Sequence, residues 1–199
     1  MTKQARAVHT RRALVRSAAG VFGRRGYAEA TLSMISSGAG VSAGALHFHF
    51  DNKAAIGAAV ERSAAGVLCR AADEVDAQRR SALQSLVGTT HAYARALSAD
   101  IVVRAGFQLA RDTCYAPVVD LRREWRSRVR RLIAEAVEEE ALLPGVTGAC
   151  AAAMVIAATT GFEELGQRDP RWLAPETLDD FWHLALPCVA TETARSALR

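Results

Sequence analysis

Residues 31–50 read TLSMISSGAGVSAGALHFHF, and this stretch decides the fold. Thr31 and Ser42 each precede a short segment with apolar residues at helical spacing, and both residue types favour the capping position of a helix. Between the two segments, residues 38–41 contain two glycines, which break a helix, and Gly40 suits a left-handed backbone in the turn. Two short helices joined by such a turn predict a helix-turn-helix, whose second helix enters the major groove of DNA.

The segment from residue 43 to residue 50 is the predicted recognition helix. Leu46 and Phe50 lie four residues apart and should be buried on one face of it. The helix N-terminus after Ser42 presents free amide groups, which favour a DNA phosphate. We expect the other residues to face the groove, with small side chains first and polar or aromatic ones behind them. They are Ala43, Gly44, His47, Phe48 and His49.

Positive charge is concentrated in the first quarter of the chain. Residues 1–53 carry eight Lys or Arg and two acidic residues, a net charge of +6, whereas residues 54–199 carry 17 basic and 19 acidic residues, a net charge of −2. Binding to a phosphate backbone requires such a basic segment, although a membrane surface or a solubilising face would fit the composition equally well. Lys53, at the end of this segment, should reach a phosphate beside the recognition helix.

The rest of the chain is predicted to be helical. Half of the residues are hydrophobic, with many alanines and few strand-forming residues. A first helix is expected from Val8 to Arg24, with Gly26 as its stop. We therefore predict an all-α protein with a helix-turn-helix domain at residues 1–53 and a helical bundle at residues 54–199. Helical blocks of the bundle are expected at residues 54–76, 81–97, 100–112, 118–139, 147–166 and 175–190.

The sequence predicts no metal site, cofactor site or membrane segment. The four cysteines lie tens of residues apart without a C-x-x-C pair, so reduced and largely buried thiols are expected. His47 and His49 would point to different faces of a helix and make a poor metal site. The longest apolar stretch, residues 149–158, is about half of the roughly 20 residues that a membrane helix needs, and the N-terminus lacks a signal core. We expect a cytoplasmic protein without metal, cofactor or membrane partner.

Catalysis is the competing class of function. Residues 38–40 resemble half of a dinucleotide fingerprint, but Ala43 stands where the third glycine belongs, and the segment follows a helix rather than a strand. The patterns G-x-S-x-G, H-E-x-x-H and the P-loop do not occur. We predict that the chain is not an enzyme. A helical protein that binds a metabolite and has no DNA target remains an alternative.

The helix-turn-helix closely resembles the DNA-binding signature of the TetR family of repressors. Residues 3–7 and 44–50 are similar to one branch in particular, the γ-butyrolactone autoregulator receptors of antibiotic-producing actinomycetes. The resemblance is strong over residues 3–60 and faint elsewhere. The matching positions in the signature are Thr31, Leu32, Ile35, Ala39, Gly40, Val41, Ser42, Gly44, Leu46, His49, Phe50 and Lys53.

The resemblance implies a homodimer on palindromic operator DNA. In this family the last two helices build a four-helix dimer interface, and the apolar block at residues 147–166, which must be covered on several sides, suits that role. The expected DNA-binding residues are Lys3, Arg6, Thr31, Ser42, Ala43, Gly44, His47, Phe48, His49 and Lys53.

The resemblance also implies a ligand site in the bundle. Trp125 falls where the branch carries a tryptophan that lines the pocket, although a core tryptophan is the default interpretation. Thr160 could donate to a ligand carbonyl, but a helical threonine often bonds its own preceding carbonyl instead. Phe162 completes the expected ligand-binding residues.

Two departures from the branch refine the expected function. The family commonly has tyrosine where this chain has His47. The sequence pI of about 9.2 resembles pseudo-receptors, which respond to antibiotics or their intermediates, rather than true butyrolactone receptors. We therefore expect a repressor of antibiotic biosynthesis genes that is released by a small hydrophobic secondary metabolite or a butyrolactone signal. A repressor of a drug-efflux gene is the alternative within the family.

Overall fold

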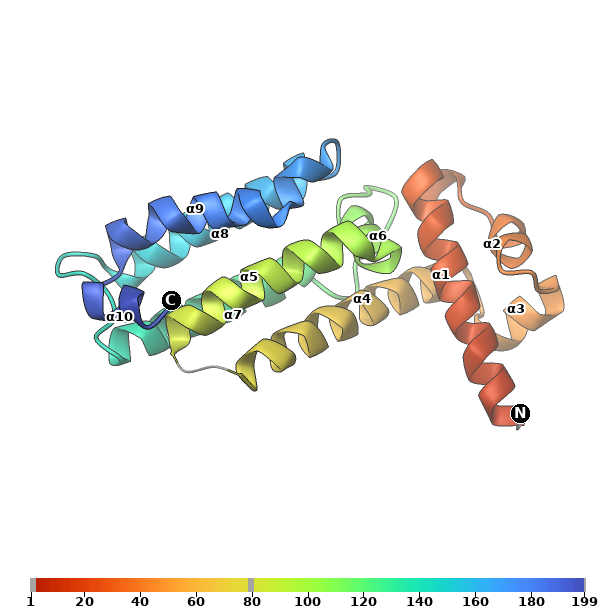
Figure 1. The fold of residues 1–199 in the computed structure, drawn as a ribbon. Coiled ribbons are helices and arrows are strands. Elements are labelled where there is room, and N and C mark those ends of the chain that lie inside the picture. Colours follow the sequence, from red (N-terminus) through yellow and green to blue (C-terminus); the bar gives the residue numbers. More distant parts are fainter. Residues whose placement is uncertain (1–2, 79–80, 199) are drawn as a thin grey trace. The chain divides into compact units, whose positions relative to one another are not determined.

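The computed structural model describes residues 3–78 and 81–198, and within them the fold is all helical, as predicted (Figure 1). The single strand-like feature in the described ranges is an isolated antiparallel bridge between Leu142 and Ala190. The helices are α1 (Lys3–Glu29), α2 (Leu32–Gly38), α3 (Ala43–His49), α4 (Lys53–Asp76), α5 (Ala82–Ala99), α6 (Ile101–Leu109), α7 (Leu121–Glu138), α8 (Gly148–Leu165), the 3-10 helix η1 (Pro170–Leu173), α9 (Pro175–Val189) and α10 (Glu192–Ser196).

The predicted elements are present, with differences at their ends. Gly26 has a positive φ of 75°, so it interrupts the helical backbone, but a further short helical piece follows it and α1 extends to Glu29. The α7 helix begins at Leu121 rather than at residue 118, and the backbone amides of residues 118 and 119 donate to a glutamate side chain. The elements η1 and α10 were not predicted, since each is a single short turn.

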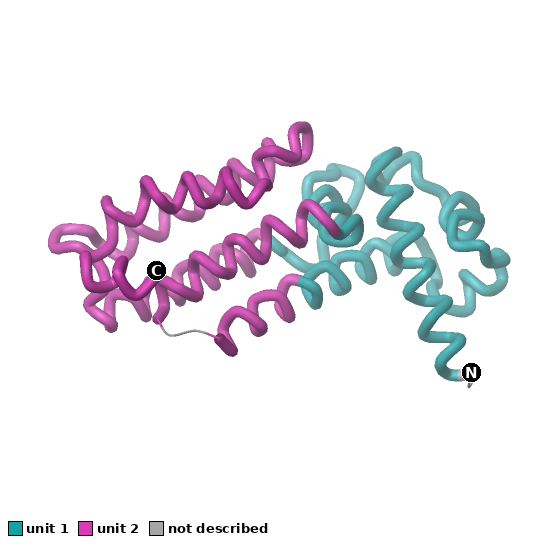
Figure 2. The backbone as a smooth tube through the Cα atoms, viewed as in Figure 1, with its two compact units in different colours: residues 1–67, 100–121 teal, residues 68–99, 122–199 magenta. Residues whose placement is uncertain are grey.

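The chain forms two compact units that alternate along the sequence (Figure 2). Unit 1 comprises residues 1–67 and 100–121, and unit 2 comprises residues 68–99 and 122–199. Helix α4 contributes to both units, and α6 belongs to unit 1 together with the helix-turn-helix.

The core of unit 1 is built around α1, which packs along α6 and against α2. Leu14, Ala18 and Phe22 follow one another at four-residue steps on α1 and are all buried. Ile35 of α2 and Leu46 of α3 are fully buried, so the two short helices are fixed to α1 by their apolar residues. This packing leaves the opposite faces of α2 and α3 in solvent.

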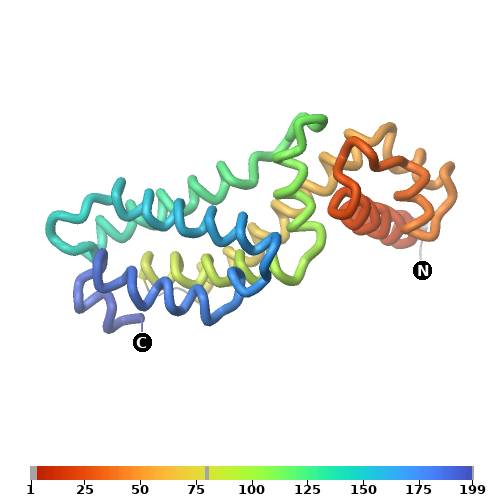
Figure 3. Tube along the Cα trace, turned by 90° about the horizontal axis from the view of Figure 1, so that it is seen from above, coloured from red at the N-terminus to blue at the C-terminus, as the bar shows by residue number. Residues whose placement is uncertain are grey.

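The core of unit 2 is a helical bundle in which α5 packs on α8 and α9. Helices α5 and α7 run antiparallel, because the backbone N–H of Ala82 donates to the Glu139 carboxylate at one end and Tyr93 contacts Trp125 at the other. Helices α8 and α9 also run in opposite directions and are joined at η1 (Figures 1 and 3). The buried cluster unites Leu86, Trp125, Leu132, Val155 and Trp182.

One expectation about the surface is wrong. All four cysteines, Cys69, Cys114, Cys150 and Cys188, are free thiols that lie exposed on the chain rather than buried. Three of them lie on the outward faces of α4, α8 and α9, whose opposite faces are buried in the core. Cys114 lies in the segment after α6. Within residues 3–78 and 81–198, no helix is long and apolar enough to span a bilayer.

Candidate DNA-binding and ligand-binding sites

The helix-turn-helix has the local geometry that its sequence predicts. The Thr31 hydroxyl accepts from the N–H of Met34 at 3.2 Å and caps α2, and the Ser42 hydroxyl accepts from the N–H of Ala45 at 3.2 Å and caps α3. In the turn, Gly40 adopts a left-handed backbone with φ of 66°. Side-chain caps and a glycine turn therefore fix the second helix relative to the first.

The outward face of α3 carries the predicted contact residues. Ala43, Gly44 and His47 are exposed, and the Phe48 side chain is 80% exposed, which is unusual for so large an apolar group. The His49 ring is partly buried and meets the Phe48 ring edge-on, with 5.1 Å between the ring centres. Helix α3 thus presents small residues at its start and an aromatic ring flanked by imidazoles at its end.

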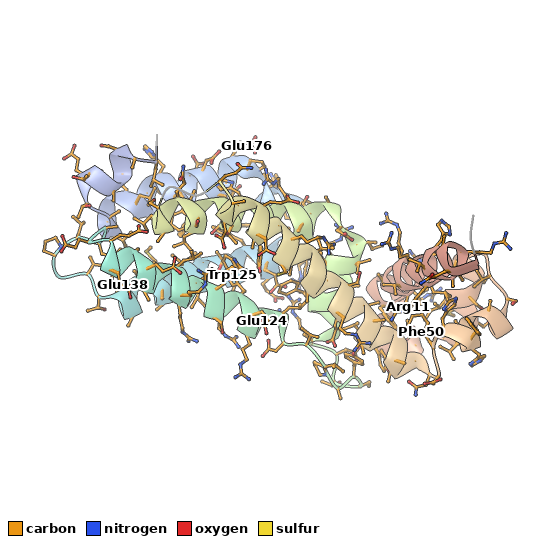
Figure 4. All side chains as sticks on the ribbon, turned by 90° about the horizontal axis from the view of Figure 1, so that it is seen from below. Arg11, Phe50, Glu124, Trp125, Glu138 and Glu176 are labelled. Atoms are coloured by element: carbon orange, nitrogen blue, oxygen red, sulfur yellow. The ribbon has the colours of Figure 1, made fainter. Side chains whose placement is uncertain are left out.

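Of the two basic residues of α1 that are predicted to contact DNA, the structure describes the side chain of one. Arg6 is exposed on the first turns of α1, whereas the side chain of Lys3 lies outside the described part of the structure. A further arginine, Arg11, lies over the ring of Phe50 at 5.0 Å from its centre (Figure 4). Sequence reasoning missed this contact because the two residues are 39 positions apart in the sequence.

Lys53 holds the end of α1. Its ammonium group donates to the carbonyl oxygens of Tyr27, Ala28 and Ala30 at 2.7, 3.1 and 2.9 Å. The same group lies 4.5 Å from the centre of the Tyr27 ring. An ammonium group has three donors, so a phosphate contact would require Lys53 to give up one of these carbonyls.

Glu61 is a fully buried carboxylate of unit 1 that the sequence did not single out. Its Oε2 atom accepts from the Tyr115 hydroxyl at 2.9 Å and from the N–H groups of Val118 and Val119 at 2.8 and 3.3 Å. Burial, and then the hydrogen bond to Glu61, raise the pKa of Tyr115 above its ordinary value, so the phenol keeps its proton. One acceptor on α4 therefore fixes the segment between α6 and α7.

The same segment is tied to α1. Asp112 accepts from the N–H of Tyr27 at 2.8 Å, one residue after the break at Gly26. The ring centres of Tyr27 and Tyr115 lie 4.8 Å apart. Lys53, Tyr27, Tyr115 and Glu61 thus form a continuous series of contacts inside unit 1.

In unit 2, Trp125 is only 7% exposed and lies within the bundle (Figure 4). Its indole N–H donates to the Thr159 hydroxyl at 2.8 Å, and that hydroxyl donates to the carbonyl of Val155 at 2.7 Å. The Tyr93 ring lies 4.5 Å from the indole ring, and burial raises the pKa of Tyr93 to about 12. Two aromatic rings and a hydroxyl therefore meet between α5, α7 and α8.

The structure does not bring Thr160 to Trp125. Thr160 is exposed, and its neighbour Thr159 is the residue whose hydroxyl bonds the indole, since adjacent helical residues point about 100° apart. Phe162, which is partly buried, stacks on Trp172 with 6.4 Å between ring centres and meets Phe181 edge-on at 5.5 Å.

An open groove of about 630 Å³ runs between α7 and α8. Its lining is mainly apolar, with Arg130 and Glu138 as the charged members. The other lining residues are Ile133, Ala134, Val137, Gly148, Ala149, Ala152, Ala153 and Ile156. In the described ranges, no group of three or more His, Cys, Asp or Glu side chains is arranged to hold a metal ion.

Known proteins are similar to this chain over its helix-turn-helix and over nearly its whole length. Residues 14–60 match the family described as bacterial regulatory proteins, tetR family. The A-factor receptor protein of Streptomyces griseus is 31% identical over 191 residues, which is 96% of this chain and 67% of that protein. These relatives are regulators of the tetR family, which are not enzymes.

Solved structures agree over nearly the whole chain. A γ-butyrolactone receptor described as ArpA-like is 29% identical with a TM-score of 0.80, and the match covers 97% of this chain and 94% of that one. CprB from Streptomyces coelicolor, solved in complex with its operator sequence, is 30% identical with a TM-score of 0.78 and the same coverage of 97% and 94%. The chain therefore belongs to the tetR family of bacterial regulatory proteins, as a ligand-responsive DNA-binding repressor related to the γ-butyrolactone receptors.

Proposed function

We propose that this chain represses genes of antibiotic biosynthesis by binding a palindromic operator as a homodimer, and that a small hydrophobic secondary metabolite releases it. The main observation in support of DNA binding is the exposed face of α3, where a capped helix presents Phe48 with 80% of its surface in solvent. An apolar ring on a recognition helix suits contact with thymine methyl groups, and the His47 imidazole suits a hydrogen bond to a base edge.

The dimer is part of this proposal because one recognition helix reads only a few base pairs. Two copies on two half-sites give useful affinity, and the operator then mirrors the two-fold axis of the protein. We propose Arg6, Lys3 and the exposed hydroxyls of Thr31 and Ser42 as backbone contacts that set the position of α3. Ala43, Gly44 and His49 complete the proposed face, and the small residues let the helix approach the bases.

The ligand half of the proposal rests on Trp125. Its indole, the Tyr93 ring and the Thr159 hydroxyl provide stacking area and one polar partner, which suits a flat and largely hydrophobic molecule. The pI of about 9.2 favours an antibiotic or its intermediate over a butyrolactone. Thr160 and Phe162 remain candidates for contacts with parts of the ligand beyond the indole.

Release follows if the ligand prefers a conformation in which the recognition helices no longer match successive major grooves. Moving such an equilibrium from 1:99 to 99:1 takes a difference in ligand affinity of roughly 5.5 kcal/mol between the two conformations. Helix α4 connects the two units along the chain and is the candidate lever.

A footprint on DNA from the chain's own promoter region tests the proposal. We expect protection of two half-sites related by a two-fold axis and separated by about one helical turn. Protection that disappears on adding an aromatic secondary metabolite supports both halves. If the protein protects no promoter fragment at low salt, it is not a repressor of these genes.

A further inference from the structure

Three residues of α5 form a polar stripe along the inner side of the bundle. Ser85, Thr89 and Tyr93 follow at four-residue steps and therefore share one face of the helix. The Tyr93 end of this stripe contacts Trp125 of α7, and the antiparallel α7 continues along α5 from there. The stripe thus leads from the indole into the core.

Two hydroxyls of the stripe are buried without a hydrogen-bond partner among the described residues. Ser85 and Thr89 are 0% exposed, and neither Ser85 Oγ nor Thr89 Oγ1 is bonded. Threonines elsewhere in unit 2 behave differently. Thr90 Oγ1 donates to the carbonyl of Leu86 at 2.8 Å, and Thr159 Oγ1 donates to that of Val155 at 2.7 Å.

An unbonded hydroxyl in an apolar core destabilises the protein that contains it. Leu83 and Leu86, close to these positions on α5, and Leu132 of α7 belong to the buried apolar cluster around Trp125. Alanine or valine at positions 85 and 89 would fill the same volume without that loss. The two hydroxyls therefore need an explanation other than stability.

We propose that Ser85 and Thr89 are a hydrogen-bonding subsite of the ligand site beside Trp125, which rests on the ligand half of the proposed function. Residues four apart on a helix are separated by about 6 Å along its axis. The subsite therefore fits an uncharged, flat molecule with two oxygen acceptors a similar distance apart, as in quinones and polycyclic ketones. Stacking on Trp125 and two donated hydrogen bonds would hold it.

The subsite also supplies the difference in affinity that release requires. A ligand reaches the two hydroxyls only when the side chains between α5 and α7 move apart, so it binds the opened form of unit 2 better than the closed form. Each hydroxyl is unbonded in the closed form and bonded in the opened, ligand-bound form, so each gains a hydrogen bond on opening.

Thermal unfolding without any ligand gives the first arm of the test. Thr89→Val removes the unbonded hydroxyl at nearly constant volume, and Thr90→Val is the matched control on the same helix with a bonded hydroxyl. We expect Thr89→Val to raise Tm by about 2–4 °C, and Thr90→Val to leave Tm unchanged or lower it. A lower Tm for Thr89→Val would overturn the proposal, because the hydroxyl would then have a structural partner.

Binding of 9,10-anthraquinone and of anthracene, followed by quenching of tryptophan fluorescence, gives the second arm. We expect the parent chain and Thr90→Val to prefer the quinone, and Thr89→Val and Ser85→Ala each to bind it about 3- to 10-fold more weakly while binding anthracene as before. Equal quinone binding by Thr89→Val and the parent would overturn the subsite alone. A parent chain that binds neither compound would contradict the aromatic ligand of the proposed function, and the subsite with it.

Discussion

The ammonium group of Lys53 illustrates how a single residue can place the DNA-binding unit. Its three carbonyl acceptors lie at the C-terminal end of α1, where the helix dipole favours a positive charge. The aromatic ring of Tyr27 faces the same group. Lys53 therefore helps to fix the position of α1 relative to α4, whatever it contacts on DNA.

Lys53→Met should lower the stability of the protein. The variant keeps the aliphatic stem but leaves three carbonyls without their donor, and the free energy of unfolding should fall by about 1–2 kcal/mol. Urea unfolding measures this, with Arg12→Met, at an exposed position of α1, as the control. If stability is unchanged and the salt dependence of DNA binding becomes flatter, Lys53 contacts a phosphate instead.

His47 and Phe48 should matter for DNA and not for folding. Replacing either with alanine should weaken operator binding about 5- to 100-fold, since each good base contact contributes roughly 1–3 kcal/mol. The melting temperature should stay within about a degree or two, because both side chains are exposed. Leu46→Ala, one position away and fully buried, should instead unfold the helix-turn-helix. A loss of Tm in His47→Ala would assign that residue to the core.

A contact of a single residue is predictable from the sequence when its partner lies nearby in the sequence. The caps at Thr31 and Ser42 join residues three apart, and both were predictable. The partner of Trp125 was not, because the choice between Thr159 and Thr160 depends on how α7 and α8 pack. The carbonyl acceptors of Lys53 were not predictable either, since they lie 23 to 26 residues away in the sequence, and its contact with DNA stays a prediction.

Among the elements, the segment from α6 to α7 is held by an unusual number of side-chain bonds. Glu61 accepts three of them and Asp112 joins the segment to α1. Gly57, one turn before Glu61, lies so close to Tyr115 that a Cβ atom there would be 2.7 Å from the ring. Helical periodicity predicts where such elements lie, but a buried carboxylate that fixes a loop leaves no periodic signal in the sequence.

Glu61→Ala should release this segment. Three donors lose their acceptor, so the free energy of unfolding should fall by at least about 2 kcal/mol, whereas Tyr115→Phe removes one of the three bonds and should lower it by about 0.5–1.5 kcal/mol. Hydrogen exchange should show faster exchange at the amides of Val118 and Val119 in Glu61→Ala and little change in Tyr115→Phe. Unchanged exchange in both variants would show that the carboxylate does not hold the segment.

For the molecule as a whole, we propose that a second copy binds on the outer sides of α8 and α9. Ala149, Ala153, Ala157 and Thr160 are exposed along α8, and Leu184 of α9 is 73% exposed. Small residues let helices approach closely, and an exposed leucine favours burial. The apolar character of α8 was visible in the sequence, but only the structure separates the residues that face the chain's own core from those that face outward.

Ala153→Arg should convert the dimer to a monomer. A long charged side chain on this stripe prevents close approach of a second α8, and operator binding should fall by at least about 100-fold because one recognition helix remains. Sedimentation measures the oligomeric state, and Ala99→Arg, at an exposed position of α5, is the control. A dimer that persists in Ala153→Arg would place the interface elsewhere.

One titration tests whether a ligand at Trp125 releases the protein from DNA. A labelled fragment of the chain's own promoter is bound by the parent or by Trp125→Phe, which keeps an aromatic ring in the core, and purified aromatic metabolites are added while fluorescence anisotropy is recorded. We expect equal DNA binding by both proteins and at least about 10-fold more metabolite for half-release of Trp125→Phe, since the variant loses indole stacking area and the bond to Thr159. Half-release of both proteins at the same metabolite concentration would contradict release through Trp125.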